Sequence, residues 1–219
     1  MHGNLAFMKS FNSADSDLLE QIILHRRDVR GNRFLDKAIP QKALNKILYA
    51  GVNAPSVGFS QPWEFVLIRD KERKQAIKAS FKEENLKAEA SFCPKRQQSY
   101  KKLKLEGIHE APVNIAVFYK PSDHPVLGQT SMKEVGRYSV VCAVQNMWLM
   151  ARALNIGLGW VSIIDPEKVK KILNAPQQNQ LVAYLCLGYV DYFYQNPELE
   201  RLNWEQRKDF SDLVKEECY

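Results

Sequence analysis

Three arginines and one aspartate occur within five consecutive residues, Arg26-Arg27-Asp28-Val29-Arg30. Guanidinium groups are planar, always charged and able to donate paired hydrogen bonds, so this cluster suits a phosphate group and the hydroxyls beside it. The aspartate adds a carboxyl that can act as an acid or a base. Taken alone, such a cluster is more often a solvated helix end in which the aspartate bridges its neighbouring arginines. Other parts of the sequence are needed to choose between these interpretations.

Polar residues and glycines with possible ligand roles occur in two later segments. Residues 53–62 are dense in turn formers and predict a loop, in which Ser56 and Gln61 could bind ligand hydroxyls and ring edges. Their alternative roles are to cap a turn and to satisfy buried backbone groups. Gly157 and Gly159 would let the backbone approach a flat ring closely, or would form a plain helix-to-strand turn.

Ser162 shares a predicted strand face with Trp160 and Ile164, so its hydroxyl would lie in apolar company. The partner of such a hydroxyl is usually a backbone carbonyl. No Ser/His/Asp order or nucleophile elbow suggests acyl transfer. The four cysteines lie far apart and the four histidines show no paired spacing, so we expect reduced, structural thiols and no metal site.

The positive charge is concentrated in one segment. The net charge is +6, but residues 71–104 hold eleven Lys/Arg against four Glu, which is 11 − 4 = +7 and leaves −1 elsewhere. No nucleic-acid-binding motif accompanies this segment, so a solvated helical face is favoured over a nucleic-acid site. The segment could also help to steer anionic substrates towards a nearby pocket.

The remaining pattern places these residues on helices, strands and loops. The first predicted helix starts at Asp15 or Ser16, turns Leu18, Leu19, Ile22 and Ile23 inward, and ends at the arginines. The other predicted helices are 40–51, 71–104 with a break at Pro94, 132–154 and 166–173, and the predicted strands are 63–68, 113–119, 160–164 and 181–190. The tail after Asp191 is polar, with Trp204 and Phe210 as isolated anchors.

Helices and strands alternate without a regular βαβ pattern and without a Gly-x-Gly-x-x-Gly turn, so an α+β sandwich is favoured over a Rossmann domain. No interdomain linker occurs, which predicts one domain over residues 1–219 with a C-terminal extension at about 191–219. The helix at 132–154 is apolar on most sides and is expected in the core or at a subunit interface. The start of the chain lacks signal-peptide features, so we expect a soluble, cytoplasmic protein without membrane or nucleic-acid partners.

The chain resembles the FMN-dependent nitroreductases over nearly its whole length. Residues 26–30 resemble the family's opening Arg-Arg-(Ser/Thr)-x-Arg signature, residues 54–63 its second signature and residues 157–159 its third. The resemblance implies an α+β fold with a mixed or antiparallel sheet flanked by helices, and an intertwined homodimer with a C-terminal arm and FMN between the subunits. The implied FMN-binding residues are Arg26, Arg27, Arg30, Ser56, Ser60, Gln61, Gly159, Trp160 and, as the best match to a basic residue near the C-terminus, Arg207.

Two departures from the general pattern are similar to a subgroup that consumes its flavin. Asp28 stands where Ser or Thr is usual, and Phe59 stands where an Asn usually contacts the flavin. In that subgroup, reduced FMN reacts with dioxygen and is fragmented to 5,6-dimethylbenzimidazole, the lower ligand base of vitamin B12, and erythrose 4-phosphate. Its two key polar residues correspond to Asp28 and Ser162, so the resemblance implies that these are catalytic.

The resemblance further implies that FMNH2 is a substrate supplied by a separate NAD(P)H:flavin reductase, with dioxygen as co-substrate. Two other functions stay open. The chain could be an ordinary NAD(P)H-dependent nitroreductase, flavin reductase or cob(II)yrinic acid a,c-diamide reductase that keeps its FMN. It could also be a non-catalytic flavin- or nucleic-acid-binding protein that uses residues 71–104.

Overall fold

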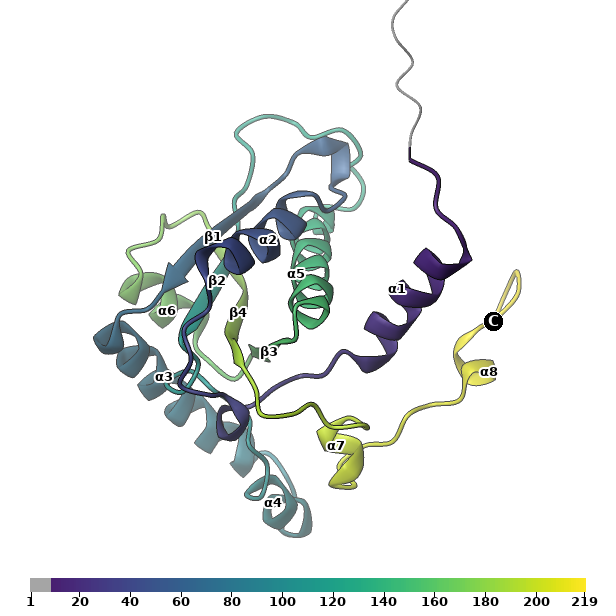
Figure 1. Cartoon of the computed structure of the whole chain (residues 1–219). Coiled ribbons are helices and arrows are strands. Elements are labelled where there is room, and N and C mark those ends of the chain that lie inside the picture. Colours follow the sequence, from purple (N-terminus) through teal and green to yellow (C-terminus); the bar gives the residue numbers. More distant parts are fainter. Residues whose placement is uncertain (1–8) are drawn as a thin grey trace, which may run out of the picture.

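A four-stranded sheet forms the centre of the computed structural model, which describes residues 9–219 (Figure 1). Its strands are β1 (Trp63–Ile68), β2 (Val113–Tyr119), β3 (Ile156–Val161) and β4 (Gln180–Tyr189), in the order β1-β2-β4-β3. All neighbouring strands are antiparallel. β2 is buried along its whole length, as its sequence predicts, which is apolar on both faces apart from Asn114.

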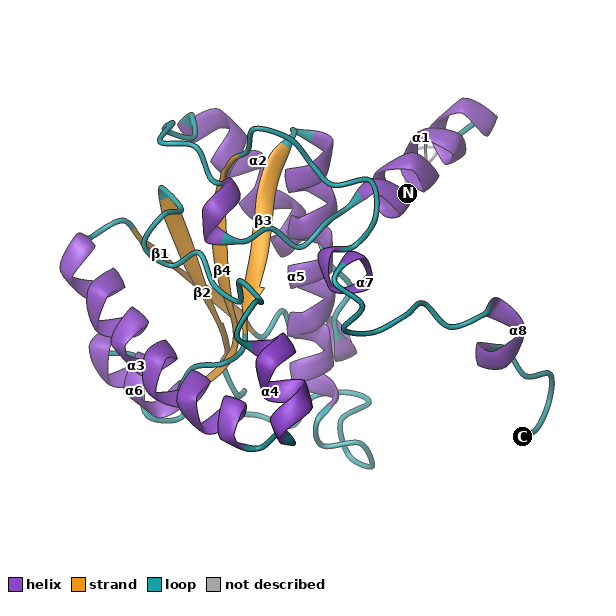
Figure 2. Cartoon of the chain, turned by 90° about the horizontal axis from the view of Figure 1, so that it is seen from below, coloured by secondary structure: helices purple, strands orange, loops and turns teal. Residues whose placement is uncertain are grey.

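Helices cover both faces of the sheet (Figure 2). Leu44 and Ile47 of α2 and Met147 of α5 are fully buried on one face, and Ile77 of α3 and Val169 of α6 are fully buried on the other. None of the helices within residues 9–219 is long and apolar enough to cross a membrane. This arrangement confirms the α+β class. The helices are α1 (Ser13–His25), α2 (Gln41–Val52), α3 (Lys71–Ala90), α4 (Pro94–Tyr100), α5 (Val135–Ala153), α6 (Pro166–Ile172), α7 (Glu198–Arg201) and α8 (Phe210–Leu213), with short 3-10 turns at Gly31–Arg33 and Val57–Phe59.

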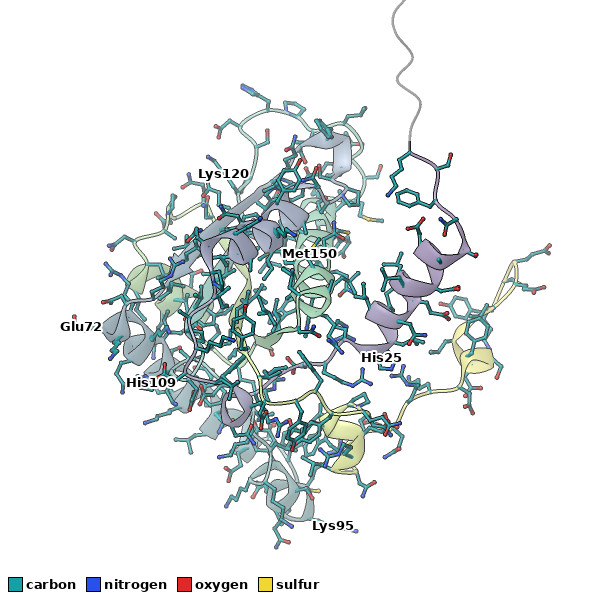
Figure 3. The ribbon with its side chains drawn as sticks, viewed as in Figure 1. His25, Glu72, Lys95, His109, Lys120 and Met150 are labelled. Atoms are coloured by element: carbon teal, nitrogen blue, oxygen red, sulfur yellow. The ribbon has the colours of Figure 1, made fainter. Side chains whose placement is uncertain are left out.

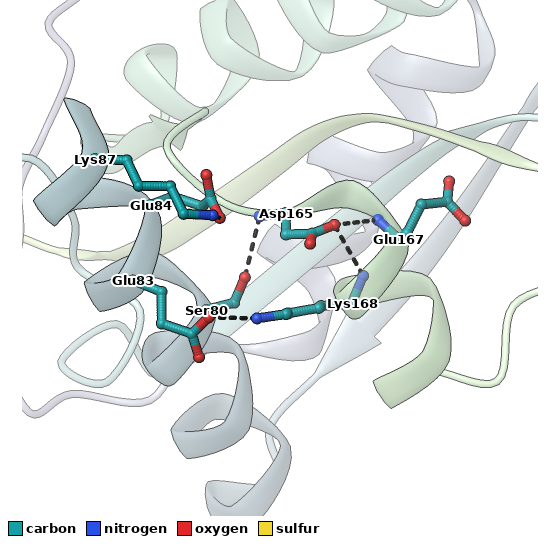
Figure 4. Close-up of polar contacts among 7 residues, drawn as sticks. All are labelled: Ser80, Glu83, Glu84, Lys87, Asp165, Glu167 and Lys168. Carbon is teal, nitrogen blue, oxygen red and sulfur yellow. Dashed lines mark hydrogen bonds and ion pairs between the residues drawn. The ribbon is translucent and has the colours of Figure 1, made fainter. Parts of the chain in front are cut away.

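The start of α6 is fixed by local hydrogen bonds, which Figure 4 shows. The Asp165 carboxylate accepts hydrogen bonds from the backbone N–H groups of Glu167 and Lys168 at 2.9 and 3.2 Å. The N–H of Asp165 donates to the Ser80 hydroxyl of α3 at 3.0 Å. The predicted helix start is therefore confirmed, and the same residue links α6 to α3.

Helix α5 buries only one of its faces. Its buried residues pack on the sheet and against α2, whereas Tyr138 is 51% and Val141 40% exposed on the opposite side. The side of α5 that faces away from the sheet is therefore uncovered in the single chain. The buried residues are Gly136, Ser139, Val140, Ala143, Val144, Met147 and Ala151.

Helix α1 stands away from the body of the molecule (Figure 1). None of its residues is buried, and Leu18, Leu19 and Ile23 are 62%, 51% and 47% exposed. The prediction that these three side chains pack inward is wrong for the single chain, because the contacts of α1 with α5 leave them exposed; Ile22, the fourth predicted residue, is half-buried. An apolar stripe of this kind, left in water, is typical of a surface that another protein covers.

The C-terminal arm, residues 191–219, packs on the body only in its first half. Trp204 contacts Phe92 and Tyr100, with ring centroids 5.3 and 6.0 Å apart, so the predicted anchor at Trp204 is confirmed. Phe210 in α8 is 80% exposed and anchors nothing within the single chain, so that prediction is wrong. In Figure 1, α8 lies on the same side of the body as α1.

Strand β3 begins earlier and ends earlier than the sequence predicts. The turn that precedes it is made by Asn155, which has a φ of +54°, so Gly157 and Gly159 lie inside the strand and not in the turn. The strand ends at Val161, so Ser162 and Ile164 lie beyond it. Short polar Asn tolerates this backbone region, and the turn therefore needs no glycine.

Gly159 allows residues 28 and 29 to run alongside the open edge of β3. Asp28 and Leu158 form a parallel bridge, and the Val29 N–H donates to the Leu158 carbonyl at 3.1 Å. A Cβ atom at residue 159 would lie 2.0 Å from the Val29 carbonyl oxygen, which is backbone and cannot swing aside. This close approach between two backbone segments requires glycine.

We expect Gly159→Ala to lower the free energy of unfolding by about 3 kcal/mol, the upper range for overpacking a buried position. Urea denaturation checks this value. Gly51→Ala is the matched control, because its Cβ would meet the flexible end of Met147 at 2.9 Å and that side chain can move. Equal effects of the two substitutions would contradict the backbone explanation.

Candidate active site

A pocket lies where residues 26–30, the end of the basic segment and α7 meet. Its cavity volume is about 130 Å³, below the range of complete small-molecule sites, so the pocket of a single chain would enclose only part of a ligand. The lining residues are Arg26, Arg27, Asp28, Arg30, Leu103, Lys104, Pro197, Glu198, Leu199 and Leu202. Four of the predicted site residues are thus brought together.

Asp28 and Arg30 both bind the backbone of Trp160. The Trp160 N–H donates to the Asp28 carboxylate at 3.0 Å, and the Trp160 carbonyl accepts a hydrogen bond from Arg30 Nη1 at 3.1 Å. Arg30 Nη1 also donates to the Leu105 carbonyl at 3.2 Å, and Arg30 Nη2 forms an ion pair with Asp28. The predicted bridge between the aspartate and an arginine is therefore present, and it is anchored to the edge of β3.

Burial raises the pKa of the Asp28 carboxyl above its ordinary value. Arg30, the Trp160 N–H and Arg26 act in the opposite direction, and Glu198 adds to the rise. The sequence alone does not show which of these effects on the pKa is larger. In the structure, the effect of burial is larger than the effect of the cationic neighbours. A carboxyl of this kind can take up and release a proton closer to neutral pH than a solvated one.

Four arginines gather beside the pocket. Burial and then the charges of Arg26, Arg207 and Arg152 lower the pKa of Arg27, and Glu200 is the acidic residue that opposes them. Arg26 lies over the Trp148 ring with its guanidinium carbon 4.9 Å from the ring centroid. Like charges held this close repel one another, so an anion bound here would be stabilised. The donor set fits a phosphate group.

The second group of predicted residues lies in the loop between α2 and β1. The Ser56 hydroxyl accepts a hydrogen bond from the Gln61 N–H at 3.0 Å, which is a turn-capping role. Ser60 has a buried hydroxyl oxygen without a hydrogen-bond partner among residues 9–219. Phe59 and Gln61 have φ angles of +53° and +47°, and the Phe59 side chain is 82% exposed. The loop is therefore held in an uncommon backbone conformation with an aromatic ring presented to solvent.

The two groups lie at opposite ends of α5 within one chain. The Val57 N–H donates to Ser139 near the start of α5, whereas Arg152 near its end donates through Nε to the His25 carbonyl at 2.8 Å. Thirteen residues of helix correspond to about 20 Å. In Figure 3, His25, which lies beside the arginines, and Lys120, whose N–H donates to the Pro62 carbonyl, lie on different sides of the molecule. A single chain does not bring Ser56, Ser60 and Gln61 to the arginines.

The four remaining predicted residues lie in four different environments. Ser162 is exposed just beyond β3, so the prediction that it sits in apolar company on a strand is wrong, because the strand ends one residue earlier. Arg207 is exposed in the arm and close enough to Arg27 to lower its pKa. The Trp160 ring is tilted against Trp148 at 6.4 Å between centroids. Gly159 packs on Val29, and its contact with flavin stays a prediction.

Sequence reasoning missed four residues of this site. Lys104 and Glu198 line the pocket, although each lies within a segment that the sequence had marked for another reason. Trp148 donates from Nε1 to the Arg27 carbonyl at 3.2 Å, and Arg152 stacks on Phe193 with 4.2 Å to the ring centroid. Trp148 and Arg152 both lie on α5. Their position on the helix relative to its buried residues is the only sequence signal that could have indicated their contacts with another segment.

Metal and thiol chemistry find no support in the part of the chain that the structure describes. No group of three or more His, Cys, Asp or Glu within residues 9–219 could hold a metal ion. Cys186 is buried, and burial raises the pKa of its thiol. Cys93, Cys142 and Cys218 are exposed, so the prediction of structural thiols is wrong for these three, which lie on surface segments.

The sequence pattern of the Nitroreductase family matches residues 23–189, which is most of the chain. The chain belongs to the nitroreductase family. Among nitroreductase-family relatives, a protein of Rhodospirillum rubrum named 5,6-dimethylbenzimidazole synthase is 42% identical, over 90% of this chain and 94% of that protein. A protein of the same name from Rhodobacter capsulatus is 33% identical, over 90% of this chain and 95% of its own length.

Solved structures of this family share the fold. An iodotyrosine deiodinase bound to FMN and 3-iodo-L-tyrosine superimposes with a TM-score of 0.72 at 21% identity, covering 92% of this chain and 100% of that chain. A nitroreductase from Desulfovibrio desulfuricans in complex with FMN gives a TM-score of 0.64 at 24% identity, covering 96% of this chain and 99% of that chain. At these identities the likeness establishes the nitroreductase-like fold alone.

We expect the stability of the protein, relative to that of its Asp28→Asn variant, to fall as pH rises above about 4, the ordinary pKa of an aspartate. The raised pKa means that the folded state binds more protons than the unfolded state between the two pKa values, so the free energy of unfolding decreases with pH there. Urea denaturation across pH 4–8 measures both proteins. Parallel pH profiles would show that the Asp28 carboxyl is not perturbed.

Proposed function

We propose that this chain binds FMN and, as a homodimer, catalyses the dioxygen-dependent fragmentation of reduced FMN to 5,6-dimethylbenzimidazole and erythrose 4-phosphate. The observation that carries this proposal is an arginine cluster beside a carboxyl with a raised pKa, at residues 26–30. The names of the Rhodospirillum and Rhodobacter relatives support the reaction. The FMN bound in two structural relatives supports the ligand.

The arginine cluster supports binding of the FMN phosphate. Arg26 makes no hydrogen bond through its guanidinium within residues 9–219, and Arg207 is exposed, so both have donors for phosphate oxygens. Asp28, Lys104 and Glu198 line the same pocket and would contact the bound flavin there.

Asp28 and Ser162 are the proposed catalytic residues. Bound FMN, in its reduced state, supplies the electrons that reduce dioxygen. Asp28 would accept and return protons, because burial raises the pKa of its carboxyl and so favours proton uptake compared with a solvated aspartate. Ser162 lies two residues beyond Trp160, whose backbone Asp28 holds, so its hydroxyl would act at the same end of the pocket.

A second copy of the chain would complete the site. Ser56, Ser60 and Gln61 lie about 20 Å of helix away from the arginines of the same chain. The outer face of α5 and the apolar side of α1 are exposed, and a symmetric partner would cover them. In such a dimer, the loop of one subunit would contact FMN bound by the arginines of the other.

The proposal also includes a separate NAD(P)H:flavin reductase. Because each turnover would consume one FMN, fresh flavin would have to be supplied at every cycle, and in this proposal the reductase supplies it as FMNH2. The alternative is an ordinary NAD(P)H-dependent reductase of this family that keeps its FMN, with a nitroaromatic, quinone or corrinoid acceptor such as cob(II)yrinic acid a,c-diamide. That alternative rests on a lower similarity, 25% and 27% identity, to proteins named NADH dehydrogenase/NAD(P)H nitroreductase and NADH dehydrogenase.

Aerobic incubation with FMN and a chemical reductant separates these two functions. We expect 5,6-dimethylbenzimidazole to form, as detected by liquid chromatography and mass spectrometry, with a matching loss of FMN. Asp28→Asn should bind FMN but lower product formation by at least about a hundredfold, the usual contribution of a general acid or base. Full recovery of FMN from the unaltered protein would favour the reductase.

We expect the protein to be a dimer that Val141→Glu dissociates, because this residue is 40% exposed on the outer face of α5 and a buried unpaired charge is strongly unfavourable. Light scattering coupled to size exclusion measures the mass, and FMN binding should weaken at least tenfold. Leu86→Glu is the matched control, since Leu86 is 67% exposed on α3 and should leave the dimer intact. A dimeric Val141→Glu protein with normal FMN binding would place the interface elsewhere.

A further inference from the structure

We propose that Arg27 is a positioning residue that fixes the C-terminal arm across the pocket and does not contact the flavin phosphate. The identity of the ligand rests on the function proposed above. The assignment of Arg27 itself rests on hydrogen bonds within the chain. Under this proposal, some arginines of residues 26–30 bind other parts of the protein and others bind the ligand.

Arg27 has already used most of its hydrogen-bond donors. A guanidinium carries five N–H groups. Its Nε donates to the Tyr194 carbonyl at 3.0 Å, and Nη2 donates to the Gln195 carbonyl. Its Nη1 donates to the carbonyls of Leu24 and Arg26 at 2.7 and 2.6 Å. One N–H is left, whereas a bidentate phosphate contact needs two parallel N–H groups.

The arm that Arg27 holds forms one wall of the pocket. Its two carbonyl partners in the arm come immediately before α7, which lines the pocket with Glu198. Glu198 is close enough to raise the pKa of Asp28. If the arm were released, the pocket would lose this wall. A flavin with a phosphate and a flavin without one would then lose the same contacts.

Arg33 holds the same arm but does not line the pocket. It donates from Nη2 to the Tyr192 carbonyl at 3.0 Å and forms an ion pair with Asp191 at 3.1 Å. Its guanidinium carbon lies 3.3 Å from the centroid of the Tyr192 ring. Any effect of an Arg33 substitution on flavin binding must therefore pass through the arm, which makes Arg33 a matched control for Arg27.

The test compares the binding of FMN and riboflavin, which differ by the phosphate, to dimeric protein. Arg27→Gln and Arg33→Gln should weaken both ligands by similar factors, about tenfold, the scale of a lost charge-assisted hydrogen bond. The ratio of the two dissociation constants should not change. Arg26→Gln should weaken FMN alone. Arg27→Lys should behave like Arg27→Gln, because an ammonium keeps the charge but cannot span several carbonyls.

Limited trypsin digestion provides a measurement that does not depend on flavin. Cleavage after Arg201, Arg207 and Lys208 should become at least tenfold faster in the Arg27 and Arg33 variants, while the melting temperature of the body changes little. Selective loss of FMN binding in Arg27→Gln, rescued in Arg27→Lys, would overturn the proposal. Unchanged cleavage of the arm in Arg27→Lys would overturn it as well. Absence of flavin binding to the unaltered protein would instead refute the proposed function.

Discussion

The backbone of Trp160, at the open edge of β3, is bound at both of its polar groups by one short segment. Its N–H donates to Asp28 and its carbonyl accepts from Arg30, while Val29 between them donates to Leu158. Residues 28–30 therefore bind the polar backbone groups at the edge of β3 partly through backbone atoms and partly through side chains. This approach is possible only because residue 159 has no Cβ, so a glycine in the sheet determines where the acid and the last arginine point.

The arginines that surround this edge meet two opposite physical demands. Arg27 and Arg30 donate hydrogen bonds to the backbone carbonyls of Tyr194, Leu105 and Trp160. The same concentration of positive charge raises the electrostatic energy of the empty pocket and lowers that of an anion complex. A site that is held together by arginines is therefore also prepared for a phosphate, and Asp28 offsets part of the positive charge through its ion pair with Arg30.

The length of α5 determines how the site can be completed. One end of this helix supports the loop with Ser56 and Gln61, and the other end supports the arginines. A rigid helix keeps these ends apart, so neither loop movement nor side-chain rotation within one chain can join them. The exposed outer face of the same helix is where a second chain would pack, which links assembly to ligand binding through one element.

The sequence by itself determined the α+β class, β1 and β2, the short α6 and the arginine cluster, because hydrophobic period, capping residues and motif spacing are local properties. It could not place Gly159 inside β3, where the reason for a glycine is the carbonyl of Val29, more than a hundred residues earlier in the chain. The sequence also could not predict that Leu18 and Leu19 are exposed in the single chain. An apolar stripe predicts burial, but it does not indicate whether the same chain or another chain packs against it. Only the tertiary structure decided which arginines bind backbone and which keep their donors, because hydrogen-bond partners such as Tyr194 and Gln195 become neighbours only when distant segments pack together.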